Sequence, residues 1–280
     1  MFKGDSKNYK CTINTVEKKW LNILSRHNQE QFKDSWLPSH DHDHHSRVWK
    51  IAKKLLHYLH GTVYEYDEAF VKKLMFAVFF HDTGMVHTLE KEHGRESRYL
   101  CSKFISDNDI HFAKKDENDL FNAIERHDDK EYKSSLEKNS FSLYHILTIA
   151  DDLDALGAIG VFRYFEIYHH RGMSTAVFSR EAKSNLTGRF NHFNQVFADH
   201  PELVIKFKPG YSYAKNFFEA CINKSESHMQ VLTILKKSII VQKKTLNEVA
   251  LDNAGSADKI IAGYFKRVLE ESAKTSNTYQ

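Results

Sequence analysis

The segment from residue 67 to residue 82 constrains the fold more than any other stretch of this chain. Its apolar residues lie on nearly every side of a helix: Phe70, Val71, Leu74, Met75, Ala77, Val78, Phe79 and Phe80. A helix that is apolar all round is stable only when it is buried. The segment runs directly into His81 and Asp82, and Gly84 ends it. We therefore expect a buried helix whose end brings two polar side chains into the core.

Apolar residues recur at helical spacing along most of the remaining sequence. The chain has only 3 proline and 11 glycine residues, so turn-rich sheets are disfavoured. The pattern predicts an all-α fold, with one short strand conceivable at 203–207. Besides 67–82, helices are expected at about 13–34, 48–60, 93–106, 117–127, 141–170, 186–199, 212–250 and 257–273.

Composition excludes several classes of protein. The 40 Lys and Arg residues nearly balance 37 Asp and Glu residues, which argues against a nucleic-acid scaffold. Three widely separated cysteines, Cys11, Cys101 and Cys221, favour a reducing compartment over a disulfide framework. No signal peptide is evident, and no apolar run approaches the roughly 20 residues that span a bilayer. We expect a cytoplasmic protein that does not enter a membrane.

Residues 39–48 contain an unusual density of potential metal ligands. Within six positions lie four histidines and two aspartates: His40, Asp41, His42, Asp43, His44 and His45. Such a stretch is either a solvated polar loop or one contribution to a buried metal site. Its neighbours in sequence do not decide between these two interpretations.

A third anomaly is a group of acids, Asp151, Asp152 and Asp154, inside a helix that is otherwise apolar. Buried charge is costly unless it is paired or bound to metal. Each polar group taken alone has an ordinary explanation, such as a helix-terminal pair or a salt bridge. Together, imidazoles and carboxylates suit a divalent first-row transition metal, which would satisfy all three segments at once.

The order of these groups resembles the HD superfamily of metal-dependent phosphohydrolases. The matching runs are His44-x-x-Arg47-Val48, His81-Asp82-x-Gly84 and Ala150-Asp151-x-Leu153-Asp154-Ala155. The run from Leu153 to Gly160 is similar to one bacterial HD subgroup. The resemblance implies an HD-domain helical core at 36–200, with one ion held by His44, His81, Asp82 and Asp151. The domains expected from it are an N-terminal helix at 1–35, the phosphohydrolase domain at 36–200 and a C-terminal helical extension at 201–280.

Helical spacing supports that ligand set only in part. His44 and His45 both border the apolar face of their helix, so spacing leaves the choice open and only the resemblance selects His44. Asp151 and Asp154 share a helix face, whereas Asp152 points about 100° away. We expect Asp154 and His40 to support the ligands without binding the ion. Asp152 is expected to be a surface or salt-bridging acid, although the subgroup usually has a basic residue there.

Two further histidines, His93 and His127, lie at helix ends. In HD proteins similar histidines complete a second metal site or contact phosphate and donate a proton. Asp128 follows His127 where members with two metals carry another histidine, so one tight ion is expected, with His93 as general acid or phosphate contact. A second ion at His93 and His127, bridged by Asp82, stays open.

The predicted reaction is hydrolysis of a phosphoester or phosphoanhydride, on a nucleotide or a related small molecule. The ion, which could be Mn, Fe, Co, Ni or Mg, would lower the pKa of a bound water from about 15.7 towards 7. Asp82 and His93 are the expected catalytic residues beside the ion. Arg47, and Lys91 or Arg95, would neutralise phosphate charge.

Other functions remain open at this point. The same ligand order fits a dinuclear-iron HD-type oxygenase, and a non-catalytic HD module could sense a nucleotide. A metal nuclease fits less well because the charges balance.

Two C-terminal features complete the sequence predictions. Apolar faces around residues 229–241 and 260–269 could cover the core or form a homodimer, and we favour a homodimer or a lid. Residues 205–215 alternate basic and aromatic side chains, which could grip a nucleobase and its phosphate. A plain turn with a solvated face is the favoured interpretation of that stretch.

Overall fold

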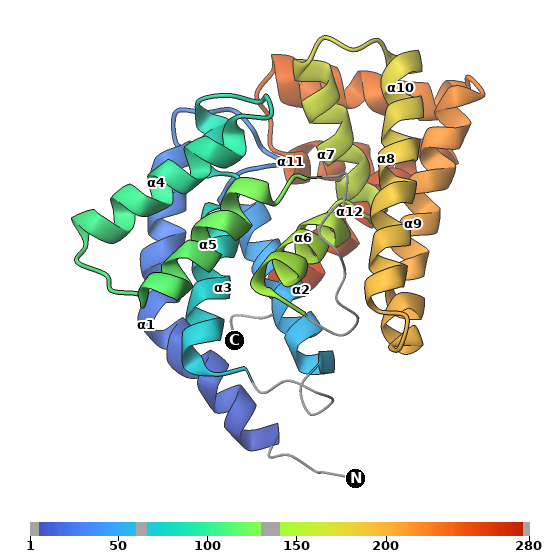
Figure 1. Cartoon of the computed structure of the whole chain (residues 1–280). Helices are drawn as coiled ribbons and strands as arrows, with labels where there is room; N and C mark the ends of the chain where they lie inside the picture. Colours follow the sequence, from blue (N-terminus) through green and yellow to red (C-terminus); the bar gives the residue numbers. More distant parts are fainter. Residues whose placement is uncertain (1–5, 60–65, 130–140, 277–280) are drawn as a thin grey trace. The chain divides into compact units, whose positions relative to one another are not determined.

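The computed structural model describes residues 6–59, 66–129 and 141–276 (Figure 1). Every regular element in these ranges is a helix, which confirms the predicted all-α class. The chain forms two compact units. The N-terminal unit comprises Met1–Ser35 and His40–Asp151, and the C-terminal unit comprises Trp36–Ser39 and Asp152–Gln280. The predicted domain boundaries at residues 35 and 200 stay predictions.

The N-terminal unit is built around one buried helix. Its elements are α1 (Ser6–Phe32), α2 (His42–Leu59), α3 (Glu68–Phe80), the 3₁₀ turn η1 (Thr83–Val86), α4 (His93–Asp107), α5 (Lys114–Arg126) and the first turns of α6 (Leu143–Asp154). Helices α1, α2, α4 and α5 all pack against α3. The arrangement exposes the first turn of α3 but leaves the rest of the helix, from Leu74 onwards, without a solvent-facing side, as its sequence predicts.

Helix α3 begins and ends at clear signals. The Asp67 side chain accepts a hydrogen bond from the Phe70 backbone at 2.7 Å, which caps the amino end. From Leu74 to Phe80 every side chain is completely buried. The helix ends at His81, and Asp82 begins the turn of η1. The two polar residues therefore follow the most deeply buried helix of the unit without an intervening loop.

Gly84 lets η1 lie directly against the start of α4. A Cβ at this position would overlap the His93 carbonyl oxygen and would lie 2.6 Å from the Ser97 backbone nitrogen. The Gly84 backbone N–H donates to the Ser97 hydroxyl at 2.8 Å. This close contact fixes the position of His93, the first residue of α4, relative to Asp82.

In the C-terminal unit, too, every regular element of the described residues is a helix. After the end of α6 it contains α7 (Gly157–His170), α8 (Thr175–Val196), α9 (Pro201–Ile222), α10 (Glu226–Leu235), the π-helical turn η2 (Lys236–Val241), α11 (Leu246–Asn253) and α12 (Lys259–Ser276). Helices α8 and α9 lie side by side along most of their length (Figure 1). Helix α12 packs on α7, α10 and α11.

The predicted single helix at 141–170 is wrong, because the chain breaks between α6 and α7. Gly157, the first residue of α7, has a φ of +77°, in the left-handed region that favours glycine. The Glu271 carboxylate of α12 then accepts hydrogen bonds from the backbone nitrogens of Ala158 and Ile159, at 3.2 and 3.0 Å. A remote side chain thus stabilises a helix start that the local sequence does not indicate.

Three other predicted elements also differ from the structure. Residues 203–207 are helical in α9, so neither a strand there nor a turn at 205–215 is correct. Helix α8 begins eleven residues before the predicted 186. The predicted helix at 212–250 is divided into α9, α10, η2 and α11.

The C-terminal apolar faces are used within their own unit. Val231, Leu235, Tyr264, Phe265 and Val268 are all at most 1% exposed. The homodimer and lid stay predictions. No helix in the described part of the chain is long and apolar enough to cross a lipid bilayer.

Candidate metal centre

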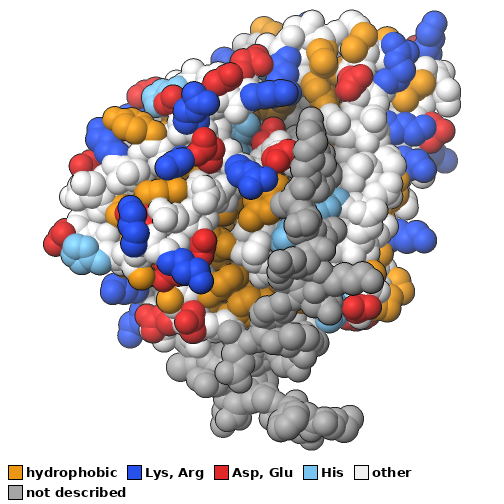
Figure 2. Space-filling view, in the orientation of Figure 1, with side chains coloured by type: hydrophobic (Ala, Val, Ile, Leu, Met, Phe, Trp, Pro, Cys, Tyr) orange, Lys and Arg blue, Asp and Glu red, His pale blue; other side chains and the backbone are white. Residues whose placement is uncertain are grey.

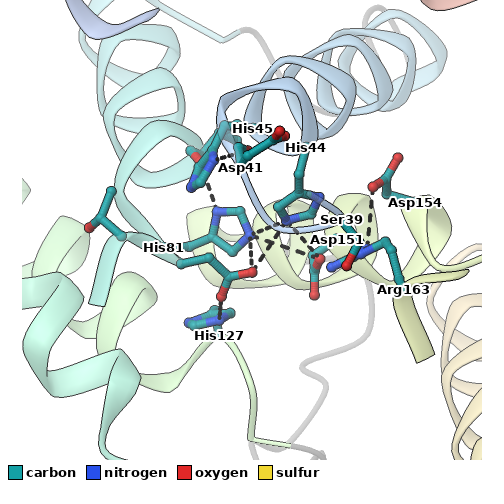
Figure 3. Close-up of polar contacts among 12 residues, drawn as sticks. Ser39, Asp41, His44, His45, His81, His127, Asp151, Asp154 and Arg163 are labelled. Atoms are coloured by element: carbon teal, nitrogen blue, oxygen red, sulfur yellow. Dashed lines mark hydrogen bonds and ion pairs between the residues drawn. The ribbon is translucent and has the colours of Figure 1, made fainter. Parts of the chain in front are cut away.

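Four buried side chains of the N-terminal unit converge on one point. His44 lies in the first turns of α2, His81 and Asp82 follow α3, and Asp151 lies on α6. Both histidines are fully buried, and the two carboxylates are 4% and 5% exposed. Figure 3 shows His44, His81 and Asp151 pointing towards one another. These are the four residues that the HD resemblance selected.

The spacing of their ligand atoms suits one divalent ion. Nε2 of His44 lies 3.1 Å from Nε2 of His81, 3.3 Å from an oxygen of Asp82 and 3.5 Å from an oxygen of Asp151. His81 Nε2 lies 3.5 and 3.8 Å from the same two oxygens. Bonds of about 2.1 Å to one ion place neighbouring ligand atoms about 3.0–3.5 Å apart. The four side chains therefore need little movement to hold an ion.

Hydrogen bonds to the backbone determine which ring nitrogens face the centre. Nδ1 of His81 lies 2.8 Å from the Val78 carbonyl oxygen. Because a carbonyl oxygen only accepts, Nδ1 carries a proton and donates it. In the neutral ring the lone pair is then on Nε2, which faces the centre. Metal-binding histidines are typically held by such a bond from their other nitrogen.

A second cluster shares Asp82 with the first. Asp82, His93 and His127 lie close enough for three ligand atoms to meet on one ion. Oδ1 of Asp82 lies 2.9 Å from His127 Nε2 and 3.6 Å from His93 Nε2, while its Oδ2 faces His44 and His81. The two histidine Nε2 atoms are 3.3 Å apart. One carboxylate therefore has one oxygen in each cluster.

His93 and His127 are oriented in the same way as His81. Nδ1 of His93 donates to the Glu90 carbonyl, and Nδ1 of His127 donates to the Ile124 carbonyl, each at 2.7 Å. In both residues Nε2 consequently faces Asp82. Three histidines on different segments repeat one arrangement, in which a carbonyl three residues earlier fixes the ring.

The electrostatic surroundings of Asp82 favour its ionised form. Burial raises the pKa of this carboxyl, but the nearby imidazoles of His81, His127 and His44 outweigh burial and hold the pKa well below its usual range. Burial lowers the pKa of His127, but the hydrogen bond to Asp82 and its charge raise that pKa to about 9. Burial and the neighbouring His127 lower the pKa of His93. The metal-free centre thus keeps its bridging carboxylate negative.

The histidine-rich stretch contributes unequally to this centre. His40 is buried, with its ring centroid 5.5 Å from that of His44. His45 is also fully buried, but its Nδ1 donates to the Asp41 carbonyl at 2.9 Å, and its Nε2 has no hydrogen-bond partner. Burial and the rings of His81 and His44 lower the pKa of His45 well below its usual value, so this ring is neutral. Spacing left His44 and His45 equivalent, whereas the structure places only His44 among the carboxylates.

The predicted phosphate-binding cations lie outside the clusters. Arg47 is half-buried on α2, and its charge acts on the carboxylate of Asp41. Lys91 and Arg95 are exposed, two residues before and after His93. Over α4 and α5, basic and acidic side chains are interspersed on the face drawn in Figure 2. Their roles in binding substrate stay predictions.

The two remaining acids of α6 belong to ion pairs in the C-terminal unit. Asp152 is 5% exposed, and its Oδ1 lies 2.6 Å from Nη1 of Arg189 on α8. Of the two predicted alternatives for Asp152, a surface acid or a salt-bridging acid, the structure shows the salt bridge. Asp154 pairs with Arg163 of α7 at 3.3 Å. Its support of the metal ligands stays a prediction.

Sequence reasoning underrated the second cluster. It gave weight to Asp128, which stands where a second histidine would be. Sequence patterns could not indicate the hydrogen bonds that orient His93 and His127, because their acceptors are the backbone carbonyls of Glu90 and Ile124 and not side chains.

The comparison with protein families corrects the predicted family. Residues 7–232, well over half of the chain, match the SidE phosphodiesterase (PDE) domain, and the HD-superfamily assignment is therefore wrong. No curated protein and no solved structure matches the chain. The match covers every residue of both clusters and assigns hydrolysis of a phosphodiester as the type of reaction. The chain belongs to the SidE phosphodiesterase domain family.

Proposed function

We propose that this chain hydrolyses a phosphodiester with the help of divalent metal ions held by the two clusters. The family supplies the type of reaction, a phosphodiesterase. The metal dependence is our inference from the site. A nucleotide as part of the substrate is a further proposal; it was inferred with the resemblance to the HD superfamily, and the family match does not address it.

One observation carries the metal proposal. Three buried histidines, His81, His93 and His127, each use Nδ1 to bind a backbone carbonyl and turn Nε2 towards Asp82. Nitrogen lone pairs and carboxylate oxygens repel one another at 3–4 Å unless protons or cations lie between them. A proton on His127 lies between this ring and Asp82, but His81 and His93 still turn Nε2 towards the carboxylate. The gathering of these acceptors in a dry core is best explained by a bound cation.

The side chains have distinct roles in this proposal. His44, His81 and Asp151 would hold the first ion, His93 and His127 would hold the second, and Asp82 would be shared between the two clusters. A divalent ion supplies a Lewis acid that lowers the pKa of a bound water from about 15.7 towards 7. The residues around it fix where water and phosphate can approach.

Protonation of the leaving oxygen requires a donor near the centre. We propose His127 as this donor when the second cluster holds no ion, because the hydrogen bond to Asp82 and its charge raise the pKa of His127 to about 9. Nδ1 of His93 holds its proton on the Glu90 carbonyl and the pKa of His93 is lowered, so the predicted role of His93 as general acid is disfavoured, whereas its role as a phosphate contact stays a prediction. Arg47 is the proposed phosphate contact, because a guanidinium can form paired hydrogen bonds to a phosphate. The exposed Lys91 and Arg95 are expected to contribute less, since water screens their charges.

A chelation experiment tests the metal proposal. The chain is treated with EDTA, dialysed and assayed with bis(p-nitrophenyl) phosphate, alone and with Mn²⁺, Co²⁺, Ni²⁺ or Mg²⁺. We expect hydrolysis to stop after chelation and to return with at least one ion. His81→Gln should lose both metal binding and hydrolysis. The matched control is His111→Gln, in the same unit, where the side chain of His111 is 86% exposed.

The alternatives give different results. Hydrolysis that survives chelation but is lost in His81→Gln would show that the histidines act without metal. Hydrolysis that His81→Gln leaves intact would place the reaction elsewhere on the chain. Nucleotide preference is tested by comparing bis(p-nitrophenyl) phosphate with the p-nitrophenyl ester of thymidine 5′-phosphate. Equal kcat/KM for the two compounds would refute recognition of a nucleoside.

A further inference from the structure

The C-terminal unit contains a cavity that the proposed reaction does not use. Helices α9 and α12 form its walls, and His228 of α10 joins them. Its volume is about 650 Å³. Cavities of about 300–1,000 Å³ are typical of small-molecule sites. The family match ends at residue 232, so the wall formed by α12 lies outside the matched region.

Aromatic side chains form the inner wall of the cavity. Phe217 and Tyr264 are 3% and 1% exposed, and their ring centroids lie 5.4 Å apart. The Tyr264 hydroxyl donates to the Ala158 carbonyl at 3.1 Å, which fixes this ring. Tyr213 provides a third, half-buried ring. The two buried rings give the cavity a rigid apolar floor, and Tyr213 is the most exposed of the three aromatic residues.

The charge of the cavity lining is mainly positive. Lys259, Lys266 and Arg267 contribute three cations, and Glu270 is the acid among the lining residues. The Arg267 guanidinium lies 4.1 Å from the ring centroid of Tyr213, and its Nε donates to Glu271 at 2.8 Å. The stacking on Tyr213 and the ion pair with Glu271 already restrict the Arg267 side chain. Binding a ligand therefore costs little further side-chain entropy at this residue. The lining therefore attracts an anion.

His228 adds a neutral polar group. Its Nδ1 lies 2.8 Å from the Ser225 hydroxyl, and its ring packs edge-on against Phe217. Burial lowers the pKa of His228, with Asp258 opposing this, so the ring is uncharged near pH 7. Nε2 is the nitrogen that remains for a ligand in this ring.

We propose that this cavity binds a small aromatic anion of the nucleoside monophosphate class. The base would lie on the apolar floor beside Tyr213, and the phosphate would lie near Lys259 and Lys266. Tyr213 is the one residue of the 205–215 stretch among the lining residues. The proposal stands apart from the metal centre and does not depend on the phosphodiesterase reaction.

A glycine in the wall allows a test that leaves the core intact. Gly263 lines the cavity, and a Cβ built on it meets nothing within 4 Å. Gly263→Leu therefore adds a bulky side chain at the cavity wall, and its Cβ meets no neighbouring atom. Gly188→Leu is the matched control, because Gly188 is also an exposed glycine inside a helix, α8, with open space around it.

Binding is measured by calorimetric titration of the whole chain with AMP, GMP, CMP and UMP in EDTA. We expect at least one of them to bind with a Kd below about 1 mM. Gly263→Leu should weaken that binding by at least about tenfold, whereas Gly188→Leu and His81→Gln should change it less than about twofold. Failure of the chelation experiment on the metal centre would not affect these results.

Reversing the charge of a lysine in the cavity lining tests how much the negative charge of the nucleotide contributes to binding. Lys266→Glu should weaken binding by about threefold or more. Lys208→Glu, at an exposed lysine of α9 outside the lining, should have no effect. The proposal is overturned if none of the four nucleotides binds, or if binding survives Gly263→Leu. Loss of binding in His81→Gln would place the nucleotide in the metal centre, and equal binding of adenosine and AMP would refute the anionic class.

Discussion

Replacing Asp151 and Asp152 singly by asparagine separates two roles of adjacent carboxylates. Both side chains are 5% exposed. An oxygen of Asp151 lies 3.5 Å from His44 Nε2, whereas an oxygen of Asp152 lies 2.6 Å from Nη1 of Arg189. Asparagine has nearly the volume of aspartate, so each change removes a charge with little effect on packing. One variant should lose metal, and the other should lose stability.

The expected cost of Asp152→Asn comes from the cation that it leaves behind. Arg189 is 8% exposed, so its guanidinium would stay in the core without the charge of its partner. Removing one member of a buried ion pair costs about 3–5 kcal/mol of unfolding free energy. In a protein of this size each kcal/mol lowers Tm by about 2–4 °C, so Tm should fall by about 6–20 °C. Metal affinity should change less than about threefold.

The expected cost of Asp151→Asn appears in metal binding. Loss of a group that only orients a ligand already weakens metal binding by about 10–100-fold. Asp151 is proposed to supply a ligand atom itself, so Mn²⁺ affinity should fall by at least about 100-fold. In EDTA the Tm of this variant should fall by less than that of Asp152→Asn, because no paired arginine loses its partner.

Calorimetric titration with Mn²⁺ and thermal unfolding in EDTA measure the two effects separately. Metal loss in Asp152→Asn with retention in Asp151→Asn would show that the assigned ligand is wrong by one residue. An unchanged Tm in Asp152→Asn would refute the stabilising role of the Arg189 pair. The double variant Asp152→Asn with Arg189→Met should recover part of the lost stability, since no charge is then left unpaired.

Two further predictions concern backbone positions. Gly84→Ala should lower the unfolding free energy by more than about 2 kcal/mol, because its Cβ would overlap the backbone of α4. Gly188→Ala should raise the unfolding free energy by about 0.5–1 kcal/mol. Urea unfolding measures both changes, and equal effects would refute the close contact at Gly84. Glu271→Gln should cost about 0.5–2 kcal/mol, because it removes the negative charge at the amino end of α7, and an unchanged urea midpoint would show that this contact is not stabilising.

The buried helix α3 could be predicted because its information is local. Every residue from Leu74 to Phe80 is apolar, so this part of the helix has no polar face that could be exposed to water. The polar pair at its end, His81 and Asp82, was therefore certain to enter the core region. The same reasoning linked His81 and Asp82 to Asp151, because Asp151 is also a charged residue in an otherwise apolar helix and needs a partner in the core.

The breaks between helices could not be predicted because their causes lie far along the chain. The start of α7 depends on Glu271, more than one hundred residues later. The continuation of α9 through Pro209 loses a backbone hydrogen bond, which packing on α8 offsets. Phe190 of α8 stacks on Tyr211 of α9 with centroids 4.1 Å apart. Neither contact leaves a signal at the residues where the helix begins or continues.

The position of Asp152 shows a similar limit of helical spacing. The angle between Asp151 and Asp152 was correct, and it did place the two carboxylates in different surroundings. Spacing left open whether that second direction leads to solvent or to a salt bridge, because Arg189 lies 37 residues later in the chain. The family assignment was wrong for a related reason, because short runs of His and Asp matched positions that the fold brings together but did not carry the sequence of the whole domain.

Asp82 is the residue at which the arrangement of the centre can be tested most directly. Its Oδ2 lies 3.3 Å from His44 Nε2, and its Oδ1 lies 2.9 Å from His127 Nε2, so each oxygen serves one cluster. If both clusters hold an ion, His44→Gln and His127→Gln should each lose one ion per chain, whereas Asp82→Asn should lose both. Metal counted per chain after gel filtration measures this, with His111→Gln as the control. Because a lone bridging carboxylate couples the two sites, retention of either ion in Asp82→Asn would refute the shared centre, and a second ion bound equally well by His127→Gln would refute the second cluster.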